Sequence, residues 1–340
     1  MLVLGIESTC DETASAVVRD GRDILSNVIT SQIDLHAEYG GVVPELSCRR
    51  HVDVIIPVIE KSLHEAKVTL QDIDLIAVAH GPGLIGALLI GLTAAKTLSL
   101  ALDKPFVGVN HIEAHLYAAL MSQPQPVTFP CMGVILSGGH TALVRMDDVG
   151  CYTLVGETID DAIGEAFDKV AKMMDLPYPG GPQIEKLAVN GNRHRYNFKP
   201  GKVKNNPFSF SFSGLKTAVL YGIKGQNCNT FNENKPLSEQ DKADAAAAFQ
   251  HAAFKDIINK SLLAAKEHSC NTLIFGGGVT NNMTLRQLFN EQAGELNLLW
   301  PSLGLSLDNA AMIAGLGYHV FKKKGKGDTF ELPAATRIAF

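Results

Sequence analysis

Residues 2–19 read LVLGIESTCDETASAVVR, and this stretch decides the fold. It holds two runs of apolar and β-branched residues, 2–6 and 14–19, with a polar turn between them, and a third run follows at 23–30. Short runs of this kind, separated by turn-prone residues, are typical of neighbouring antiparallel strands. The chain is therefore predicted to open with a three-stranded meander.

The same order of elements recurs in the second half of the chain. Runs at 132–136, 142–146 and 152–155 repeat the meander, with the turn SGGHT (137–141) in place of ESTCDET (7–13). Each meander precedes a strand, a glycine turn and a helix, which read IDLIAVAHGPGLIGALLIGLTAAK (73–96) and NTLIFGGGVTNNMTLRQLF (271–289). Each half then adds a short strand and a helix. This repeat indicates an old duplication, so we expect two α/β lobes with mixed sheets and a cleft between them.

Composition sets the broad class. The chain has 340 residues, of which 46% are hydrophobic and 19% charged, as in soluble globular proteins. Six cysteines show no CxxC spacing and are expected to be reduced thiols. The start carries no signal-like segment, so a cytoplasmic protein is expected. The longest apolar run, 84–102, contains glycines and a lysine, which favours a buried helix over a membrane span.

A basic segment stands out against the net charge of −5. Residues 186–232 contain eight Lys or Arg and no Asp or Glu. Aromatic residues are interleaved with them: Tyr196, Phe198, Phe208, Phe210, Phe212 and Tyr221. Two interpretations stay open, a surface that binds a polyanion and a solvated basic loop over an aromatic mini-core.

The stretch NHIEAHLYAAL (110–120) places His111 and His115 four residues apart. On a helix this spacing puts both imidazoles on one face, where they can bind one metal ion or simply be two polar helix positions. A zinc protease would need a glutamate directly after the first histidine, but Glu113 is two positions on. His64 and Glu65 also fail, because Val68 stands where the second histidine should be. A protease is disfavoured.

Several glycine motifs bear on nucleotide binding. GPGLIG (81–86) has the dinucleotide pattern, but the next strand ends at Asn110 without the expected acidic residue. GLTAAKT (91–97) has Ala95 where a phosphate-binding loop needs glycine. SGGHT and GGG (276–278) follow strands, so their backbone amides could surround a phosphate. We expect them at equivalent places in the two lobes, forming a nucleotide site between the lobes.

Four acidic residues crowd one short predicted helix: Asp160, Asp161, Glu165 and Asp168. They form either a solvated acidic face or, for Asp168, a contact to a ribose hydroxyl or a metal.

Ten stretches spread along nearly the whole chain resemble one family, the tRNA N6-adenosine threonylcarbamoyltransferases, formerly described as glycoproteases or O-sialoglycoprotein endopeptidases. These stretches are LGIESTCDET, HAEYGGVVPEL, GPGLIGALLIG, NHIEAH, LSGGHTALV, DDAIGEAFDKVAKM, YPGGP, FSFSGLKTAV, GGGVTNNMTLR and SLDNAAMIA.

The resemblance implies the fold of the actin-like ATPase superfamily, which has two duplicated ribonuclease-H-like lobes around an interlobe cleft. It places one lobe at 1–125 with a C-terminal segment of about 311–340. The other lobe is 126–310, with an insertion at about 177–236.

The resemblance also implies site residues. One divalent metal per subunit, Fe(II) ahead of Zn(II), is bound by His111, His115 and Asp308. Asp11 and Glu12 match acidic residues needed for activity. The substrate contacts are Ile135, Leu136, Ser137, Gly138, Gly139, Asp168, Gly181, Glu185 and Asn282. The chain departs from the usual family residues at Asn281 and Met283, next to Asn282.

The implied reaction moves the threonylcarbamoyl group from threonylcarbamoyl-AMP to N6 of adenosine 37, in tRNAs that read codons beginning with A, and releases AMP. Glu12 is the expected acceptor of the N6 proton. The implied partners are tRNA and the accessory subunits of a threonylcarbamoyladenosine synthesis complex, without a membrane. Two alternatives are kept: an ATPase or small-molecule kinase of the same superfamily, in which the histidine pair has no role, and a non-catalytic tRNA-binding scaffold.

Overall fold

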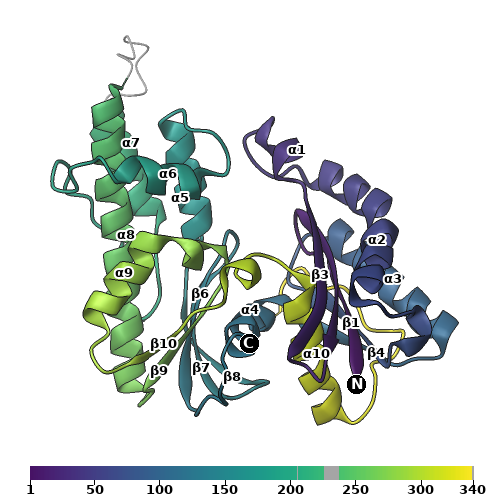
Figure 1. Ribbon diagram of the computed structural model, residues 1–340. Helices are drawn as coiled ribbons and strands as arrows, with labels where there is room; N and C mark the ends of the chain where they lie inside the picture. Colours follow the sequence, from purple (N-terminus) through teal and green to yellow (C-terminus); the bar gives the residue numbers. More distant parts are fainter. Residues whose placement is uncertain (205, 226–236, 339–340) are drawn as a thin grey trace. The chain divides into compact units, whose positions relative to one another are not determined.

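The structure is a computed structural model that describes residues 1–204, 206–225 and 237–338 (Figure 1). The end of the expected insertion, 226–236, lies outside the described residues. The chain forms two compact units, each described by itself. Unit 1 consists of Met1–Val127, Asp148–Tyr152 and Leu299–Phe340, and unit 2 of Thr128–Asp147 and Thr153–Leu298.

Unit 1 contains the predicted opening meander. Its five-stranded sheet has the order β3-β2-β1-β4-β5. Strand β1 pairs antiparallel with β2 and parallel with β4, so the sheet is mixed, as expected. The strands are β1 (Leu2–Glu7), β2 (Glu12–Arg19), β3 (Asp23–Ser31), β4 (Leu75–Gly81) and β5 (Phe106–Asn110).

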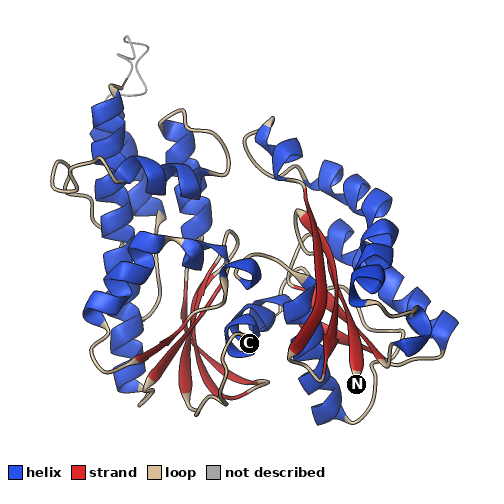
Figure 2. Ribbon diagram, viewed as in Figure 1, coloured by secondary structure: helices blue, strands red, loops and turns tan. Residues whose placement is uncertain are grey.

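Helices cover both faces of this sheet (Figure 2). The helices that cover the faces are α2 (Pro44–Ala66), α3 (Ile85–Leu102), α4 (His111–Met121) and α10 (Ala310–Lys324). Unit 1 also contains the short helix α1 (Ile33–Ala37) and 3-10 helices at Leu70–Asp72 and Leu303–Leu305. Val3 of β1 packs with α4 and α10, whereas the next residue, Leu4, packs with α2 and α3. Because side chains alternate between the faces of a strand, a strand covered on both faces is apolar at every position.

Helix α10 lies very close to β1. A Cβ atom added at Gly5 would overlap the carbonyl oxygen of Ala310 and lie 2.9 Å from the Cβ of Ala314. Glycine at position 5 therefore allows the helix to reach the sheet.

The return of the chain to unit 1 begins at residue 299, earlier than the expected 311, so the turn before α10 also belongs to unit 1.

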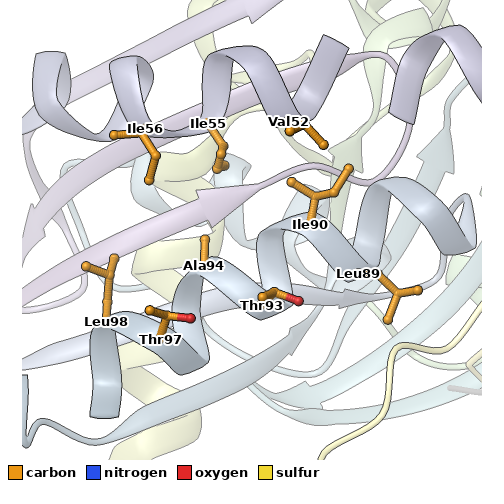
Figure 3. Close-up of a pocket in the computed structure, with 9 residues that line it drawn as sticks. All are labelled: Val52, Ile55, Ile56, Leu89, Ile90, Thr93, Ala94, Thr97 and Leu98. Atoms are coloured by element: carbon orange, nitrogen blue, oxygen red, sulfur yellow. The ribbon is translucent and has the colours of Figure 1, made fainter. Parts of the chain in front are cut away.

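Helix α3 differs from the expected buried helix. It is the one helix among the described residues that is long and apolar enough to cross a membrane, and 33% of it is buried. Its inner face packs on the sheet, while its outer face and α2 line an apolar groove of about 420 Å³. Figure 3 shows Val52, Ile55 and Ile56 of α2 opposite Ile90 and Ala94 of α3 across this groove.

Unit 2 repeats the sheet of unit 1, with the order β10-β9-β6-β7-β8. Strand β6 again pairs antiparallel with one neighbour, β7, and parallel with the other, β9. The strands are β6 (Cys131–Leu136), β7 (Thr141–Asp148), β8 (Cys151–Glu157), β9 (Thr272–Gly276) and β10 (Asn297–Leu299). The helices are α5 (Ile163–Met173), α6 (Gly180–Ala188), α7 (Ser213–Lys224), α8 (Glu239–Glu267), α9 (Met283–Gln292) and the 3-10 helix η2 (Gly278–Asn281). The duplicated α/β architecture is confirmed, and the cleft between the lobes stays a prediction.

Candidate functional site

In unit 1, the two predicted metal ligands of the HxxxH pair stand at the start of α4. The Asn110 side chain caps this helix by accepting hydrogen bonds from the amides of Ile112 and Glu113, at 2.9 and 3.4 Å. His111 is thus the first helical residue, and His115 follows one turn later. Both side chains are buried, with exposed fractions of 6% and 2%.

Asp308, in the turn before α10, completes a three-residue cluster. Its Oδ1 lies 3.1 Å from Nε2 of His115 and 3.5 Å from Nε2 of His111. One ligand atom from each of the three residues lies within 4.8 Å of the others. Atoms that bind one tetrahedral ion at about 2.1 Å are roughly 3.4 Å apart, so the two distances from Asp308 suit a shared metal.

The state of His115 supports the same conclusion. Within the described part of the chain, neither buried ring nitrogen of His115 makes a hydrogen bond, and the Asp308 oxygen 3.1 Å from Nε2 forms an ion-pair contact instead. Buried polar atoms in folded proteins are almost always paired. A metal ion bound at Nε2 would supply the missing partner there.

Glu7, which the sequence analysis missed, lies directly behind His111. It is the last residue of β1 and is fully buried. Its Oε2 lies 3.0 Å from Nδ1 of His111, on the ring edge opposite the one that faces Asp308. Burial lowers the pKa of His111, but the Glu7 and Asp308 carboxylates outweigh burial and raise this pKa to about 9. The sequence signal that could have identified Glu7 is an acidic residue at the end of the apolar run LVLGIE.

Asp11 and Glu12 lie in the turn after β1 and at the start of β2. Burial and the neighbouring Asp11 carboxylate raise the pKa of Glu12 well above its usual range. Ser31 donates a hydrogen bond of 3.0 Å to Glu12 Oε1, which opposes this rise only weakly. The Asp308 carboxylate, a candidate metal ligand, is a further cause of this rise, and the role of Glu12 as the acceptor of the N6 proton stays a prediction.

Another histidine, His51 of α2, holds this turn in place through contacts with Thr13 and Cys10. Its Nδ1 lies 2.7 Å from Thr13 Oγ1, and its Nε2 lies 3.0 Å from the carbonyl oxygen of Cys10. Ser47 donates to the same carbonyl. Burial lowers the pKa of His51, so a neutral imidazole holds the backbone next to Asp11.

In unit 2, both predicted glycine turns lie side by side, which corrects the expectation that they belong to different lobes. They follow β6 and β9, which are parallel neighbours, so both turns open at the same edge of one sheet. A Cβ added at Gly277 would lie 2.5 Å from the Leu136 carbonyl oxygen. One sheet edge thus carries both phosphate-binding candidates.

The SGGHT turn also meets the start of α5. Ser137 is almost buried, its amide donates to the His140 carbonyl at 2.9 Å, and its carbonyl accepts from the Gly164 amide at 3.2 Å. Gly138 and Gly139 are exposed, and added Cβ atoms there would meet nothing within 4 Å. Exposed amides next to a helix N-terminus favour a bound anion. Ile135 and Leu136 end the buried strand that carries this turn.

The remaining predicted nucleotide contacts join neighbouring helices of unit 2. Asp168 accepts a hydrogen bond of 2.7 Å from the Gly180 amide, at the start of α6 and next to Gly181. Glu185 of α6 accepts one of 2.6 Å from the Met283 amide. Asn282 caps α9 through the Leu285 amide, which no sequence argument identified. These residues hold the surroundings of the glycine turns together, and their nucleotide contacts stay predictions.

The acidic residues near α5 are not merely a solvated face. Asp160 accepts hydrogen bonds from the hydroxyl groups of Ser211 and Ser213, at 2.6 and 2.7 Å. Asp161 forms ion pairs with Lys169 and Lys216, at 2.7 and 2.6 Å. Both aspartates thus attach the insertion to the strand-to-helix turn.

The basic segment contains the expected aromatic mini-core, and its binding of a polyanion stays a prediction. Phe210 and Phe212 are fully buried and stack at 6.0 Å, as expected of a mini-core. Tyr196 and Phe198 stack at 5.2 Å nearer the surface, with Arg195 5.9 Å from the Tyr196 ring centroid. The exposed cations of the segment are Lys186, Arg193, Arg195, Lys199, Lys202, Lys204 and Lys224.

Solved structures with low sequence identity share the fold. A full-length HypF in its phosphate- and nucleotide-bound form matches with a TM-score of 0.63 and 12% identity, over 95% of this chain and 46% of that one. The activator of 2-hydroxyisocaproyl-CoA dehydratase from Clostridium difficile matches with a TM-score of 0.52 and 13% identity, over 96% and 97%. These are proteins of the actin-like ATPase fold, which confirms the predicted fold class.

Sequence relatives are far more similar. The family model for tRNA N6-adenosine threonylcarbamoyltransferase matches residues 23–315. The enzyme of that name from Protochlamydia amoebophila is 65% identical over 99% of this chain and 98% of its own. Its namesake from Chlamydia abortus is 51% identical over 94% and 92%. The chain belongs to the tRNA N6-adenosine threonylcarbamoyltransferase family.

Proposed function

We propose that this chain transfers a threonylcarbamoyl group to N6 of adenosine 37 in tRNAs that read codons beginning with A. The match of the family model to residues 23–315 carries this proposal. We propose threonylcarbamoyl-AMP as the donor, with AMP as the leaving product. The clustered histidines and aspartate in unit 1 favour this reaction over a superfamily ATPase or kinase and over a scaffold without catalysis, because neither alternative needs a metal cluster there.

The donor carbonyl is part of a mixed anhydride and is already activated. The protein therefore has to position the two reactants and stabilise developing charge, not to activate the acyl group. The exposed Gly138 and Gly139 amides, beside the first turn of α5, would bind the phosphate of the adenylate. Asp168, Gly181, Glu185 and Asn282 would form the surrounding wall.

We propose that His111, His115 and Asp308 bind one divalent metal. Two imidazoles and one carboxylate suit Fe(II) or Zn(II), with Fe(II) as the preferred assignment from the family resemblance. When bound, such an ion would act as a Lewis acid that anchors the threonyl part of the donor.

Asp11 and Glu12 would act as a pair. After burial, the Asp11 carboxylate is the second cause of the raised pKa of Glu12, so the two carboxyl groups interact directly. We propose that one carboxyl of this pair accepts the proton that adenosine N6 loses when the acyl group is transferred.

Binding of tRNA needs a local positive surface, because the whole chain carries a net charge of −5. The acid-free segment 186–232 supplies exposed cations, with the Arg195–Tyr196–Phe198 stack among them. Arginine and aromatic side chains together favour RNA, because they pair with phosphates and stack on bases.

Accessory protein subunits would find an apolar surface on unit 1. Ile56 and Leu89, which line the groove between α2 and α3, are 54% and 49% exposed. Continuous exposed apolar surface on a soluble protein usually binds another protein. We propose that a subunit of the synthesis complex covers this groove.

Purified protein given threonylcarbamoyl-AMP, Fe(II) or Zn(II) and unmodified tRNA should form threonylcarbamoyladenosine, identified by the mass of the nucleoside, alone or after accessory subunits are added. The reaction should need an adenosine at position 37, and a tRNA with guanosine there is the control. Hydrolysis of ATP with no modified nucleoside under every condition would show that the chain is instead an ATPase.

Replacing both His111 and His115 by alanine should abolish stoichiometric metal binding, because only one of three ligands remains. Metal content is measured by mass spectrometry after anaerobic incubation with Fe(II), and separately with Zn(II). The control is His64→Ala on the exposed side of α2. Equal metal content in the double variant and the parent would show that the cluster is not the binding site.

Gly138→Val should abolish AMP binding in calorimetry, because the valine side chain would occupy the space in which the phosphate would contact the Gly138 and Gly139 amides. The variant should fold normally, since an added Cβ at Gly138 has no protein atom within 4 Å. Gly214→Val is the matched control, because the space around Gly214 is equally open. Parental AMP affinity in Gly138→Val would rule out this turn as the phosphate site.

Replacing Arg193, Arg195, Lys199 and Lys202 by alanine should weaken tRNA binding and flatten its dependence on log salt by roughly three to four units. AMP binding should not change, because none of these residues belongs to the glycine-turn region. The matched control replaces four other exposed cations, Arg49, Arg50, Lys255 and Lys266. A parental salt slope in the first variant would assign RNA binding to another surface.

A further inference from the structure

The buried carboxylate of Glu7 needs an explanation. Its exposed fraction is 0%, although an ionised carboxylate in a protein interior is unfavourable unless it is paired. It ends a strand whose other residues are apolar or glycine, so the packing of the strand does not itself call for a charge there. The contacts of Glu7 show what the charge does.

Each oxygen of Glu7 faces one donor. Oε1 accepts a hydrogen bond of 2.7 Å from the Thr9 amide, and Oε2 lies 3.0 Å from Nδ1 of His111. The first contact fixes the direction of the carboxylate, and the second aims it at the imidazole. Glutamine would present one acceptor oxygen and one NH₂ donor, so it would not favour a protonated Nδ1 on His111 as a carboxylate does.

The second contact also decides which nitrogen of His111 is available. If Nδ1 carries the proton and donates it to Glu7, the lone pair of the neutral ring is on Nε2. Nε2 is the nitrogen that lies 3.5 Å from Asp308, within the three-residue cluster. His115 differs, since in the described part of the chain its Nδ1 has no hydrogen-bond partner. Only one of the two histidines is thus oriented by a carboxylate.

We propose that Glu7 is a positioning residue for the metal site: it holds His111 as the Nδ1-protonated tautomer and turns Nε2 toward the ion. This inference rests on the proposed metal site. Carboxylates behind metal-binding histidines fix the ring and raise its basicity, and their loss typically reduces metal affinity by about 10- to 100-fold.

The first test measures Zn²⁺ affinity by calorimetry with a competing chelator. Glu7→Gln should weaken binding by about 10- to 100-fold. Glu113→Gln is the control, because it removes a carboxylate that lies between the two histidines. Burial raises the pKa of Glu113 to about 7 against the opposing effects of Lys323 and Asn110, so both variants are measured well above this pH, where Glu113 is charged. If both variants lost the same amount of Zn²⁺ affinity, the effect of Glu7 would come from its negative charge alone and the proposal would be overturned.

A double-mutant cycle separates positioning from a general structural role. In a His111→Ala background, Glu7→Gln should cause almost no further loss of Zn²⁺ affinity, because Glu7 acts through His111. A loss as large as in the parent background would show that Glu7 only supports the fold of β1, and would contradict the proposal.

The tautomer itself can be observed without metal. Long-range ¹H–¹⁵N spectra of protein labelled at histidine nitrogens, recorded near pH 10, report which nitrogen of His111 carries the proton when the ring is neutral. In the parent and in Glu113→Gln, the Nδ1-protonated tautomer of His111 should dominate. In Glu7→Gln this tautomer should no longer dominate. Circular dichroism checks that each protein is folded. An Nε2-protonated parent would overturn the proposal. If the parent shows the expected tautomer but binds no Zn²⁺, the metal assignment fails and the orientation of His111 by Glu7 stands.

Discussion

The close packing of α10 on β1 is the constraint on which unit 1 depends. It requires glycine at position 5, because any side chain would overlap the backbone of Ala310. The helix begins at Ala310, directly after the turn that carries Asp308. Packing of the C-terminal segment therefore places Asp308 beside two histidines that lie about 200 positions earlier in the chain, at separations of 3.1 and 3.5 Å. The three candidate metal ligands come together only when this helix is docked.

Strand direction explains the rest of the constellation. Strands β1, β4 and β5 are parallel, so their carboxyl ends meet at one edge of the sheet, where α/β proteins place their sites. Glu7 ends β1 and Asn110 ends β5, and the residues that follow them supply the acidic turn and the histidine pair. In unit 2 the parallel neighbours β6 and β9 bring two glycine turns together by the same rule. A duplicated fold thus presents the candidate metal ligands in one unit and the candidate phosphate-binding turns in the other.

Much of this could be predicted from sequence, since strand patterns, glycine turns and the helix spacing of His111 and His115 are local signals. The errors came from contacts distant in the chain. Periodicity cannot show that the chain returns to unit 1 at residue 299, or that β6 and β9 are neighbours. Nor can it separate a buried helix from α3, which packs on one face only. Glu7 was missed because its partner is 104 positions away.

X-ray absorption spectroscopy of the metal-loaded protein tests the central claim most directly. The cluster of His111, His115 and Asp308 predicts a first shell of nitrogen and oxygen at about 2.0–2.2 Å, with the outer-shell scattering of two imidazole rings. That scattering should fall to one ring in His111→Ala. A sulfur shell at about 2.3 Å, or a spectrum without imidazole scattering, would place the metal elsewhere and contradict the account.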